Sequence, residues 1–308
     1  MWEAFRSGAT IVLQGLQRYW PPLAYFCRAL ELELTYPVQA NAYVTPAGAQ
    51  GLAVHYDTHD VFVLQVAGNK DWEVFEPVFA DPLATQPWAE RKTTDTGPPI
   101  LLVDLQAGDS LYVPRGFLHS ARAQARLSAH VTIGILAQTR HDVLRDVVAA
   151  AAGEVGFRRA LPPGFAHDEA LFAKEVDAAV SDLRHWLDSV DTGAAAAALV
   201  RRFWATRGAR LEGHLHQLLL LETIDDATVL RRRPGSVCYA HLDGDQLAVT
   251  LGDRLLRMAA VLGPALQRVA AGQEFALGAL GDLLDQGSRL VLARRLVREG
   301  LLEIVAVG

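Results

Sequence analysis

The stretch His55-Tyr-Asp57-Thr-His59-Asp60-Val-Phe-Val-Leu-Gln-Val66 decides the fold, together with Gly108-Asp-Ser-Leu-Tyr-Val-Pro-Arg-Gly-Phe-Leu-His119. Each joins a short apolar run to Gly, Pro or Asp residues, which are typical of the turns between strands. Residues 72–75, 100–105 and 127–136 add further short apolar or alternating runs. Several short strands at close spacing predict a β-sandwich or a barrel in the first half of the chain.

The two stretches also carry metal-ligating side chains. Residues two apart on a strand share a face, so His55 and Asp57 can point toward one ion. His119, which enters a later strand, would complete a set of two histidines and one carboxylate. Such a set leaves coordination positions open, as in the non-haem Fe(II) oxygenases. A His-x-Asp pattern alone also occurs by chance at surface strand ends, and it is the surrounding strands and turns that favour the metal hypothesis.

Two further segments alternate polar with apolar residues. The polar positions are Asn41, Tyr43 and Thr45 in the first segment and Ser128, His130 and Thr132 in the second. Ordinary half-exposed strands would show the same alternation. Beside a candidate metal motif, however, the pattern favours a polar barrel interior, because buried polar side chains need an ion, water or ligand as partner.

Lys70 follows a Gly-Asn turn and shares strand parity with Trp72. A lysine on a neighbouring strand of the same barrel could bind the far end of a metal-bound dicarboxylate as a point charge. The plainer interpretation is a solvated hairpin lysine. His59, just past the candidate metal pair, is expected to be an exposed loop histidine, with a substrate-facing or supporting role as the alternative.

These motifs resemble those of the JmjC-type cupin oxygenases, and within them the ribosomal-oxygenase branch. The residues that carry the resemblance are Asn41-x-Tyr43-x-Thr45-Pro46, His55-Tyr-Asp57, Gly68-x-Lys70-x-Trp72 and Pro114-Arg-Gly-x-x-His119. They span about 80 residues in a matching order, and the later part of the chain resembles that branch more loosely. The chain begins close to the cupin motifs, so the N-terminal part of the catalytic domain is expected to be short.

The resemblance implies a double-stranded β-helix with Fe(II) bound by His55, Asp57 and His119, and O2 as co-substrate. It also implies 2-oxoglutarate held by Lys70, with Tyr43, Asn41 and Thr132 as hydrogen-bonding partners. Ser128 and His130 would lie behind these groups and support them. Members of the branch hydroxylate a side-chain carbon of a histidine or arginine in ribosomal proteins, so a protein or peptide substrate is expected.

Three alternatives stay open at this point. The substrate could be a peptide natural product that the enzyme tailors, or an N-methyl-lysine whose hydroxylation ends in demethylation. The chain could also be a non-catalytic cupin that only binds a partner. The presence of His55, Asp57, His119 and Lys70 together argues against the last alternative, because a binding module does not require all four.

The periodicity changes along the chain and predicts an α+β protein in three parts. Residues 1–138 would form the JmjC/cupin catalytic domain, with a helix at 22–34 outside the barrel. Residues 139–226 carry helical periodicity at 141–155, 168–190 and 194–221, which predicts a helical bundle. The resemblance to the ribosomal-oxygenase branch implies that this bundle is a dimerisation domain, so a homodimer is expected. Residues 227–308 would form a winged-helix-like module, with helices at 254–261, 277–284 and 288–299 and strands at 246–250 and 301–305.

Composition limits the functional class. The 308 residues carry a formal net charge of −6, which argues against a surface built to bind nucleic acid or anionic lipid. The arginines at 231–233 and on the last helix are expected to be solvated or to face another subunit. Two cysteines are too few for a disulfide framework, and no apolar run approaches the ~20 residues of a membrane span. We therefore expect a cytoplasmic protein with no membrane contact.

Overall fold

The computed structural model describes residues 1–90 and 95–307. Contacts divide the chain into two compact units, Met1–Val143 and Leu144–Gly308. The further division of the second unit at residue 226 stays a prediction. Among the described residues, no helix combines the length and the apolar character that crossing a membrane would require.

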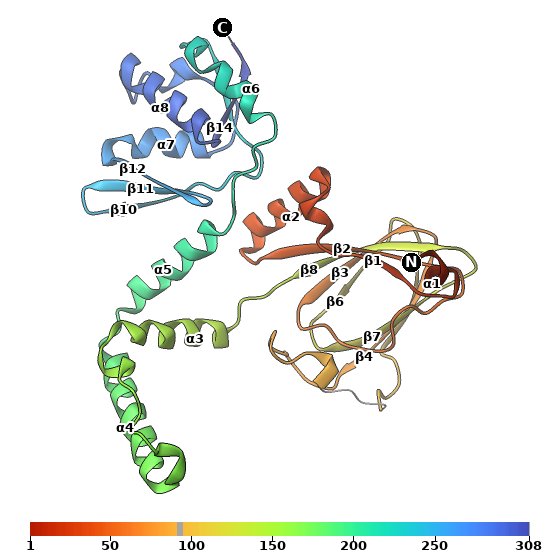
Figure 1. Ribbon diagram of the computed structural model, residues 1–308. Helices are drawn as coiled ribbons and strands as arrows, with labels where there is room; N and C mark the ends of the chain where they lie inside the picture. The colour runs from red at the N-terminus through yellow and green to blue at the C-terminus, as the bar shows by residue number, and fades with distance from the viewer. Residues whose placement is uncertain (91–94, 308) are drawn as a thin grey trace. The chain divides into compact units, whose positions relative to one another are not determined.

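The first unit is built from two antiparallel sheets that face each other (Figure 1). The larger sheet has the order β1 (Ile11–Leu13), β2 (Val38–Thr45), β8 (Ser128–Ile135), β3 (Asp60–Ala67), β6 (Ser110–Val113). The smaller sheet has the order β5 (Leu101–Leu105), β4 (Lys70–Pro77), β7 (Phe117–Ala123). Apolar side chains of β3, β4 and β5 pack in the space between the sheets, among them Val61, Val63, Trp72 and Leu105.

Strands β2 and β8 have one apolar face and one polar face. Helix α2 (Pro21–Leu34) covers the apolar face, where Leu23 and Cys27 pack against Ala40 and Ile133. The polar residues of the two strands are direct cross-strand partners on the opposite face: Asn41 with Thr132, Tyr43 with His130, and Thr45 with Ser128. The short segments α1 (Trp2–Arg6), η1 (Leu16–Arg18) and η2 (Trp88–Glu90) complete this unit.

Helices dominate the chain from residue 140 to 219. They are α3 (Arg140–Ala150), α4 (Glu169–Asp188), α5 (Thr192–Ala205) and α6 (His214–Leu219), with the short turns η3 (Ala151–Gly153), η4 (Gly156–Arg158) and η5 (Phe165–His167). Asp168 and Asp191 cap α4 and α5, as expected from their positions in the sequence. The single helix predicted over 194–221 is wrong: the chain leaves the helix after Ala205 and restarts after Gly213, which has a left-handed φ of 69°.

The C-terminal part of the second unit combines two small sheets with helices. One sheet is β10 (Tyr239–Asp243), β11 (Gln246–Leu251) and β12 (Arg254–Ala259); the other is β13 (Phe275–Ala276), β9 (Val229–Arg232) and β14 (Leu302–Ala306). The helical segments are η6 (Leu221–Thr223), η7 (Ala260–Leu262), α7 (Gly263–Ala270), η8 (Leu277–Leu280) and α8 (Gln286–Arg298). Leu230, Leu277, Leu296 and Val297 lie at the centre of its core.

The helix predicted over residues 254–261 is wrong. Residues 254–259 form a strand that pairs in register with β11, from Leu251 opposite Arg254 to Gln246 opposite Ala259. Gly252, at a left-handed φ of 63°, makes the tight turn between them. Cross-strand pairing therefore overrode a spacing of apolar residues that also suits a helix.

Several arginines of this part are held in ion pairs. Arg231 binds Glu303 at 2.6 Å, Arg289 binds Asp226 at 2.5 Å, and Arg295 binds Glu299 at 2.9 Å. Their charges are thus compensated within the chain.

Candidate metal centre

The backbone brings the two histidines of the candidate metal set side by side. His55 lies before β3 and forms a two-way bridge with His119 of β7: its N–H donates to the His119 carbonyl at 3.2 Å, and the His119 N–H donates to the His55 carbonyl at 2.8 Å. The Gly116 N–H donates to the Asp57 carbonyl at 3.0 Å. The segment 55–57 is therefore fixed against the turn and strand that supply His119.

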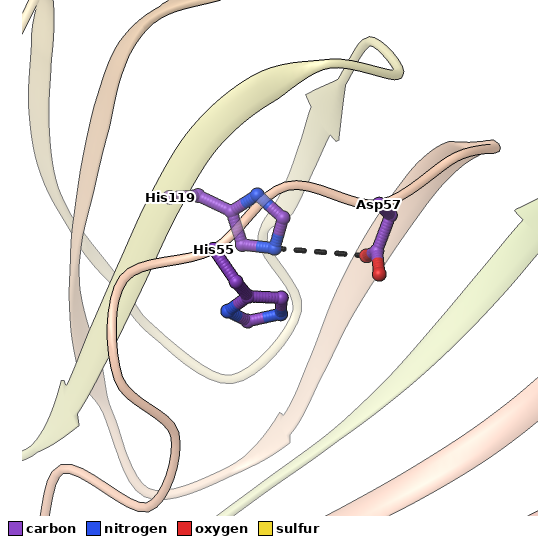
Figure 2. Close-up of side chains that lie close together, drawn as sticks. All are labelled: His55, Asp57 and His119. Carbon is purple, nitrogen blue, oxygen red and sulfur yellow. Dashed lines mark ion pairs between the residues drawn. The ribbon is translucent and has the colours of Figure 1, made fainter. Parts of the chain in front are cut away.

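The three side chains converge (Figure 2). One ligand atom from each of His55, Asp57 and His119 lies within 4.8 Å of the others. Nε2 of His119 is 3.6 Å from Oδ2 of Asp57, and the two imidazole rings have centroids 4.5 Å apart. Two imidazoles and one carboxylate at this separation suit a divalent transition metal and leave positions open for other ligands.

Hydrogen bonds hold both imidazoles in the form that binds a metal. Nδ1 of His55 lies 2.8 Å from the Ala53 carbonyl, and Nδ1 of His119 lies 3.1 Å from the Phe117 carbonyl. Because a carbonyl accepts only, each Nδ1 carries a proton, and Nε2 is therefore the nitrogen that each ring can offer to a metal. Burial, reinforced by His55, lowers the pKa of His119 to about 4, so this ring is neutral at physiological pH.

Lys70 lies in the same cavity and is 3% exposed. Its Nζ donates to Thr45 Oγ1 at 3.0 Å and lies 3.4 Å from Nδ1 of His130. Burial lowers the pKa of Lys70 to about 8, which leaves it mostly protonated at neutral pH. Among the described residues no carboxylate pairs with this ammonium group, and a buried cation without an anion is costly.

Aromatic and polar side chains surround Lys70 in the cavity. Tyr43 and His130 stack with centroids 4.9 Å apart and an interplanar angle of 3°. Burial, with a smaller contribution from Asp57, raises the pKa of Tyr43, so its hydroxyl stays a neutral hydrogen-bonding group. Trp72 is 5% exposed, and its buried indole N–H has no partner within the described part of the chain. Thr132 also lines the cavity.

Asn41, predicted to hydrogen-bond 2-oxoglutarate, and Ser128, predicted to lie behind the binding groups, are both outside the cavity lining. Asn41 uses its side-chain oxygen to accept the Gly15 N–H at 2.9 Å. Ser128 is fully buried and accepts a hydrogen bond from Gln65 Nε2 at 2.8 Å. Both therefore stabilise the barrel wall around the site.

Thr45 and Trp72 contact the site but were not predicted as site residues. Both were recognisable in principle, because Thr45 shares strand parity with Tyr43, and Trp72 shares it with Lys70. The distances of Thr45 to Lys70 and of Trp72 to the histidines depend on how the two sheets face each other. One sequence does not determine that spacing.

Comparison with known proteins supports this picture of the first unit. Residues 15–143 match the JmjC domain family. The bifunctional lysine-specific demethylase and histidyl-hydroxylase NO66 of Dictyostelium discoideum is 36% identical over 170 residues, which are 53% of this chain and 33% of the relative. Human ribosomal oxygenase 1 is 34% identical over 172 residues, or 53% of this chain and 27% of the relative. The chain thus spans a third or less of these two relatives.

Solved structures extend the similarity to nearly the whole chain. The X-ray structure of E. coli ycfD matches with a TM-score of 0.57 and 18% identity, covering 96% of this chain and 78% of that one. A structure of the ribosomal oxygenase YcfD from the same organism, in complex with cobalt and 2-oxoglutarate, matches with a TM-score of 0.53 and 19% identity over the same shares. This similarity bears on the fold, and it confirms the predicted cupin/JmjC class.

Proposed function

We propose, from the match of residues 15–143 to the JmjC domain family and from the residues of the barrel, that the protein is an Fe(II)- and 2-oxoglutarate-dependent oxygenase. Its product would be a protein or peptide hydroxylated at a side-chain carbon. The activity named for the relatives belongs to longer proteins, so for this chain it is argued from the residues of the barrel.

The observation that carries the proposal is the buried, uncompensated Lys70 in the cavity of the metal cluster. Its ammonium group has three N–H donors, and Thr45 and His130 are neutral partners for two of them. The remaining donor and the unpartnered Trp72 indole N–H suit a carboxylate. A dicarboxylate with one end on the metal and the other near Lys70 satisfies both. The residues present therefore fit Fe(II) and 2-oxoglutarate.

Each group of the chain has a role in this proposal. His55, Asp57 and His119 would hold the iron, and Lys70 would hold the far carboxylate of 2-oxoglutarate, with Tyr43 and Thr132 as hydrogen-bonding groups. When bound, iron and co-substrate supply the oxidative chemistry, in which O2 and 2-oxoglutarate are consumed and succinate and CO2 are released. The chain itself orients the ligands through the Ala53 and Phe117 carbonyls and excludes water with the apolar side chains between the sheets.

A histidine or arginine of a ribosomal protein is the substrate we favour, because the relatives are named as ribosomal oxygenases and a histidyl-hydroxylase. With such a substrate, we propose that the enzyme acts in the cytoplasm. Tailoring of a peptide natural product is the second candidate. A binding function without catalysis is disfavoured, because it does not explain a buried lysine next to a complete metal cluster.

We further propose that the helical part forms a homodimer and that residues 227–308 act as a winged-helix-like structural module. Apolar residues along α4 recur at alternating spacings of four and three, Phe172, Val176, Ala179, Leu183 and Trp186, and Val190 just past the helix end continues the pattern. This spacing is typical of a seam between packed helices. No residue of α4 or α5 is buried within the chain. A second copy of the chain would cover this seam.

The test of the proposed activity is succinate formation from 2-oxoglutarate with Fe(II) in air, followed by mass spectrometry of ribosomal proteins incubated with the enzyme. We expect succinate and a mass increase of one oxygen on a histidine or arginine. Succinate together with oxidation of a small peptide, but of no ribosomal protein, would support the tailoring function. Absence of succinate would contradict the oxygenase proposal.

A further inference from the structure

The hydroxyl of Thr45, which accepts a hydrogen bond from Lys70, has a second partner in the N-terminal segment of the chain. In the pairing of β1 with β2, Ile11 lies opposite Val44. The next residue, Thr10, therefore lies opposite Thr45, and the two Oγ1 atoms are 2.9 Å apart. Directly opposite residues share one face of a sheet, and Thr–Thr hydrogen bonds are among the contacts that such pairs make.

The direction of this hydrogen bond follows from the partners of Thr45. An ammonium group only donates, so Thr45 Oγ1 accepts from Lys70 Nζ at 3.0 Å and keeps its own hydrogen. Within residues 1–90 and 95–307, Thr10 Oγ1 is the acceptor that remains for this hydrogen. Thr45 therefore donates to Thr10, and a chain of hydrogen bonds runs from Lys70 through Thr45 to Thr10.

A backbone turn encloses the two threonines. Gly51 has a left-handed φ of 80°, and a Cβ atom on it would collide with Thr10 Oγ1 and lie 3.7 Å from Thr45 Oγ1. The turn is fixed to the end of β7, because the Ala123 N–H donates to the Ala49 carbonyl at 2.9 Å. Thr45 is fully buried as a result, so water does not compete for its hydroxyl and the hydrogen bonds are formed in a medium of low dielectric constant.

The rotation of the Thr45 hydroxyl decides how it meets Lys70. A lysine side chain is flexible, and its ammonium group stays in one place only where its partners hold it. A Thr45 hydroxyl turned the other way would direct its hydrogen toward the ammonium group instead of a lone pair. Thr10 fixes this rotation by taking the hydrogen on the far side, and Thr10 itself lines the cavity.

We propose that Thr10 is a positioning residue for the co-substrate: it holds the lone pairs of Thr45 toward Lys70 and so keeps the ammonium group aimed at the far carboxylate of 2-oxoglutarate. This proposal rests on the proposed function, because it takes Lys70 as the group that binds that carboxylate. The segment before β1 then belongs to the co-substrate site, although 35 positions separate Thr10 from Thr45.

The experiment uses the full chain loaded with Zn(II), which is redox-inert, so that 2-oxoglutarate binds without being consumed. Isothermal titration calorimetry measures the dissociation constant of 2-oxoglutarate. Thr10→Val keeps the shape of the side chain and removes the acceptor oxygen, and we expect it to weaken binding about three- to tenfold, the effect of one lost hydrogen bond. Thr10→Ser keeps the hydroxyl and should restore most of the lost affinity.

A double-mutant cycle separates the positioning of Lys70 from a general contribution to the barrel. In a Lys70→Ala background the ammonium group is absent, so Thr10→Val should have no further effect on 2-oxoglutarate binding. A threonine that only stabilised the fold would weaken binding by the same factor in both backgrounds. Thr85→Val is the matched control, because Thr85 is exposed and lies outside the cavity lining, and it should bind 2-oxoglutarate like the wild type.

The outcomes separate this proposal from the one on which it rests. If the wild type does not bind 2-oxoglutarate, or Lys70→Ala binds it as tightly as the wild type, both are overturned. If Lys70→Ala weakens binding and Thr10→Val does not, only the role of Thr10 is overturned. Equal losses in Thr10→Val and Thr10→Ser, or additive losses in the double variant, would also overturn the role of Thr10 alone.

Discussion

Within the described part of the chain, the barrel interior buries a lysine with no carboxylate partner and an indole N–H with no hydrogen-bond partner, whereas helix α4 leaves apolar side chains exposed. In the barrel, Lys70 is 3% exposed and has no carboxylate beside it within the described residues. On α4, Val176 is 44% and Leu187 is 41% exposed. The barrel lacks a negative charge beside Lys70, and the helix lacks apolar packing partners. The two regions therefore require different partners: an anion with a metal ion in the barrel, and an apolar protein surface along the helix.

Among the substitutions in the barrel, removal of a metal ligand should cause the largest loss of binding affinity. Asp57→Ala leaves two imidazoles and no carboxylate, and we expect Fe(II) to bind at least about 100-fold more weakly, since loss of even an outer supporting residue costs 10–100-fold. Metal content after dialysis against limiting Fe(II) measures this. Asp81→Ala removes an exposed surface carboxylate and serves as control. Retention of full metal content by Asp57→Ala would mean that another group holds the ion.

Lys70→Ala should affect the co-substrate and not the metal. Loss of one partner of a buried charge pair costs about 2–5 kcal/mol, so we expect 2-oxoglutarate to bind at least about 30-fold more weakly with Fe(II) affinity nearly unchanged. Titration of the metal-loaded protein with 2-oxoglutarate gives both values. Lys174→Ala changes an exposed lysine of α4 and should behave like the wild type. Unchanged affinity in Lys70→Ala would show that the distal carboxylate binds elsewhere.

A charge placed among the apolar residues of α4 should weaken the proposed dimer. Leu183→Asp introduces a carboxylate where a second copy would pack, and we expect dimer dissociation to become at least about tenfold easier. Sedimentation velocity over a concentration series measures the change. Ser181→Asp adds the same charge away from the seam and should leave the dimer intact. A wild type that is monomeric at all concentrations would contradict the homodimer.

The smallest expected effect is a gain of stability when Lys70 is replaced without a ligand present. Burial lowers the pKa of Lys70 from 10.5 to about 8, so below about pH 8 the folded chain carries a buried charge that destabilises it. Lys70→Met removes that cost, which corresponds to about 3 kcal/mol, but loses the hydrogen bonds to Thr45 and His130. We expect the free energy of unfolding to rise by about 1–2 kcal/mol at neutral pH.

The pH dependence of this effect has a defined sign. Between about pH 8 and 10.5 the unfolded wild type binds more protons at Lys70 than the folded wild type does, so wild-type stability rises with pH in this window. The advantage of Lys70→Met should therefore shrink as the pH rises. Chemical denaturation of both proteins at pH 7, 9 and 10.5 measures it. A constant difference would argue that Lys70 does not change its ionisation there.

The barrel strands and the metal cluster could be predicted from the sequence because each depends on local spacing. The runs at 60–66, 110–113 and 127–136 correspond to β3, β6 and β8. His55 and Asp57 share a face because they are two residues apart, and a turn places His119 at the start of its strand. Lys70 could likewise be predicted to point into the barrel, because it lies two residues from Trp72 on the same strand.

Other features depend on contacts between distant segments and were not predictable. Asn41 lies two residues from Tyr43 on β2 and was therefore expected to face the cavity. Its side-chain oxygen instead accepts a hydrogen bond from the Gly15 N–H of a distant segment. Residues 254–259 became a strand because β11 pairs with them. His59 is seated in the barrel because Gly134, 75 positions later, lacks a side chain. In each case a long-range partner overrides the local pattern.

The most direct test of the central claim is an anaerobic titration of the metal-free protein with Fe(II) and then 2-oxoglutarate, monitored by visible absorption. If the His55, Asp57, His119 cluster and Lys70 hold iron and co-substrate together, the wild type should develop the weak charge-transfer band of the chelate. Lys70→Ala should develop it only at much higher 2-oxoglutarate concentrations. Absence of the band in the wild type, or identical titrations of the two proteins, would contradict the account.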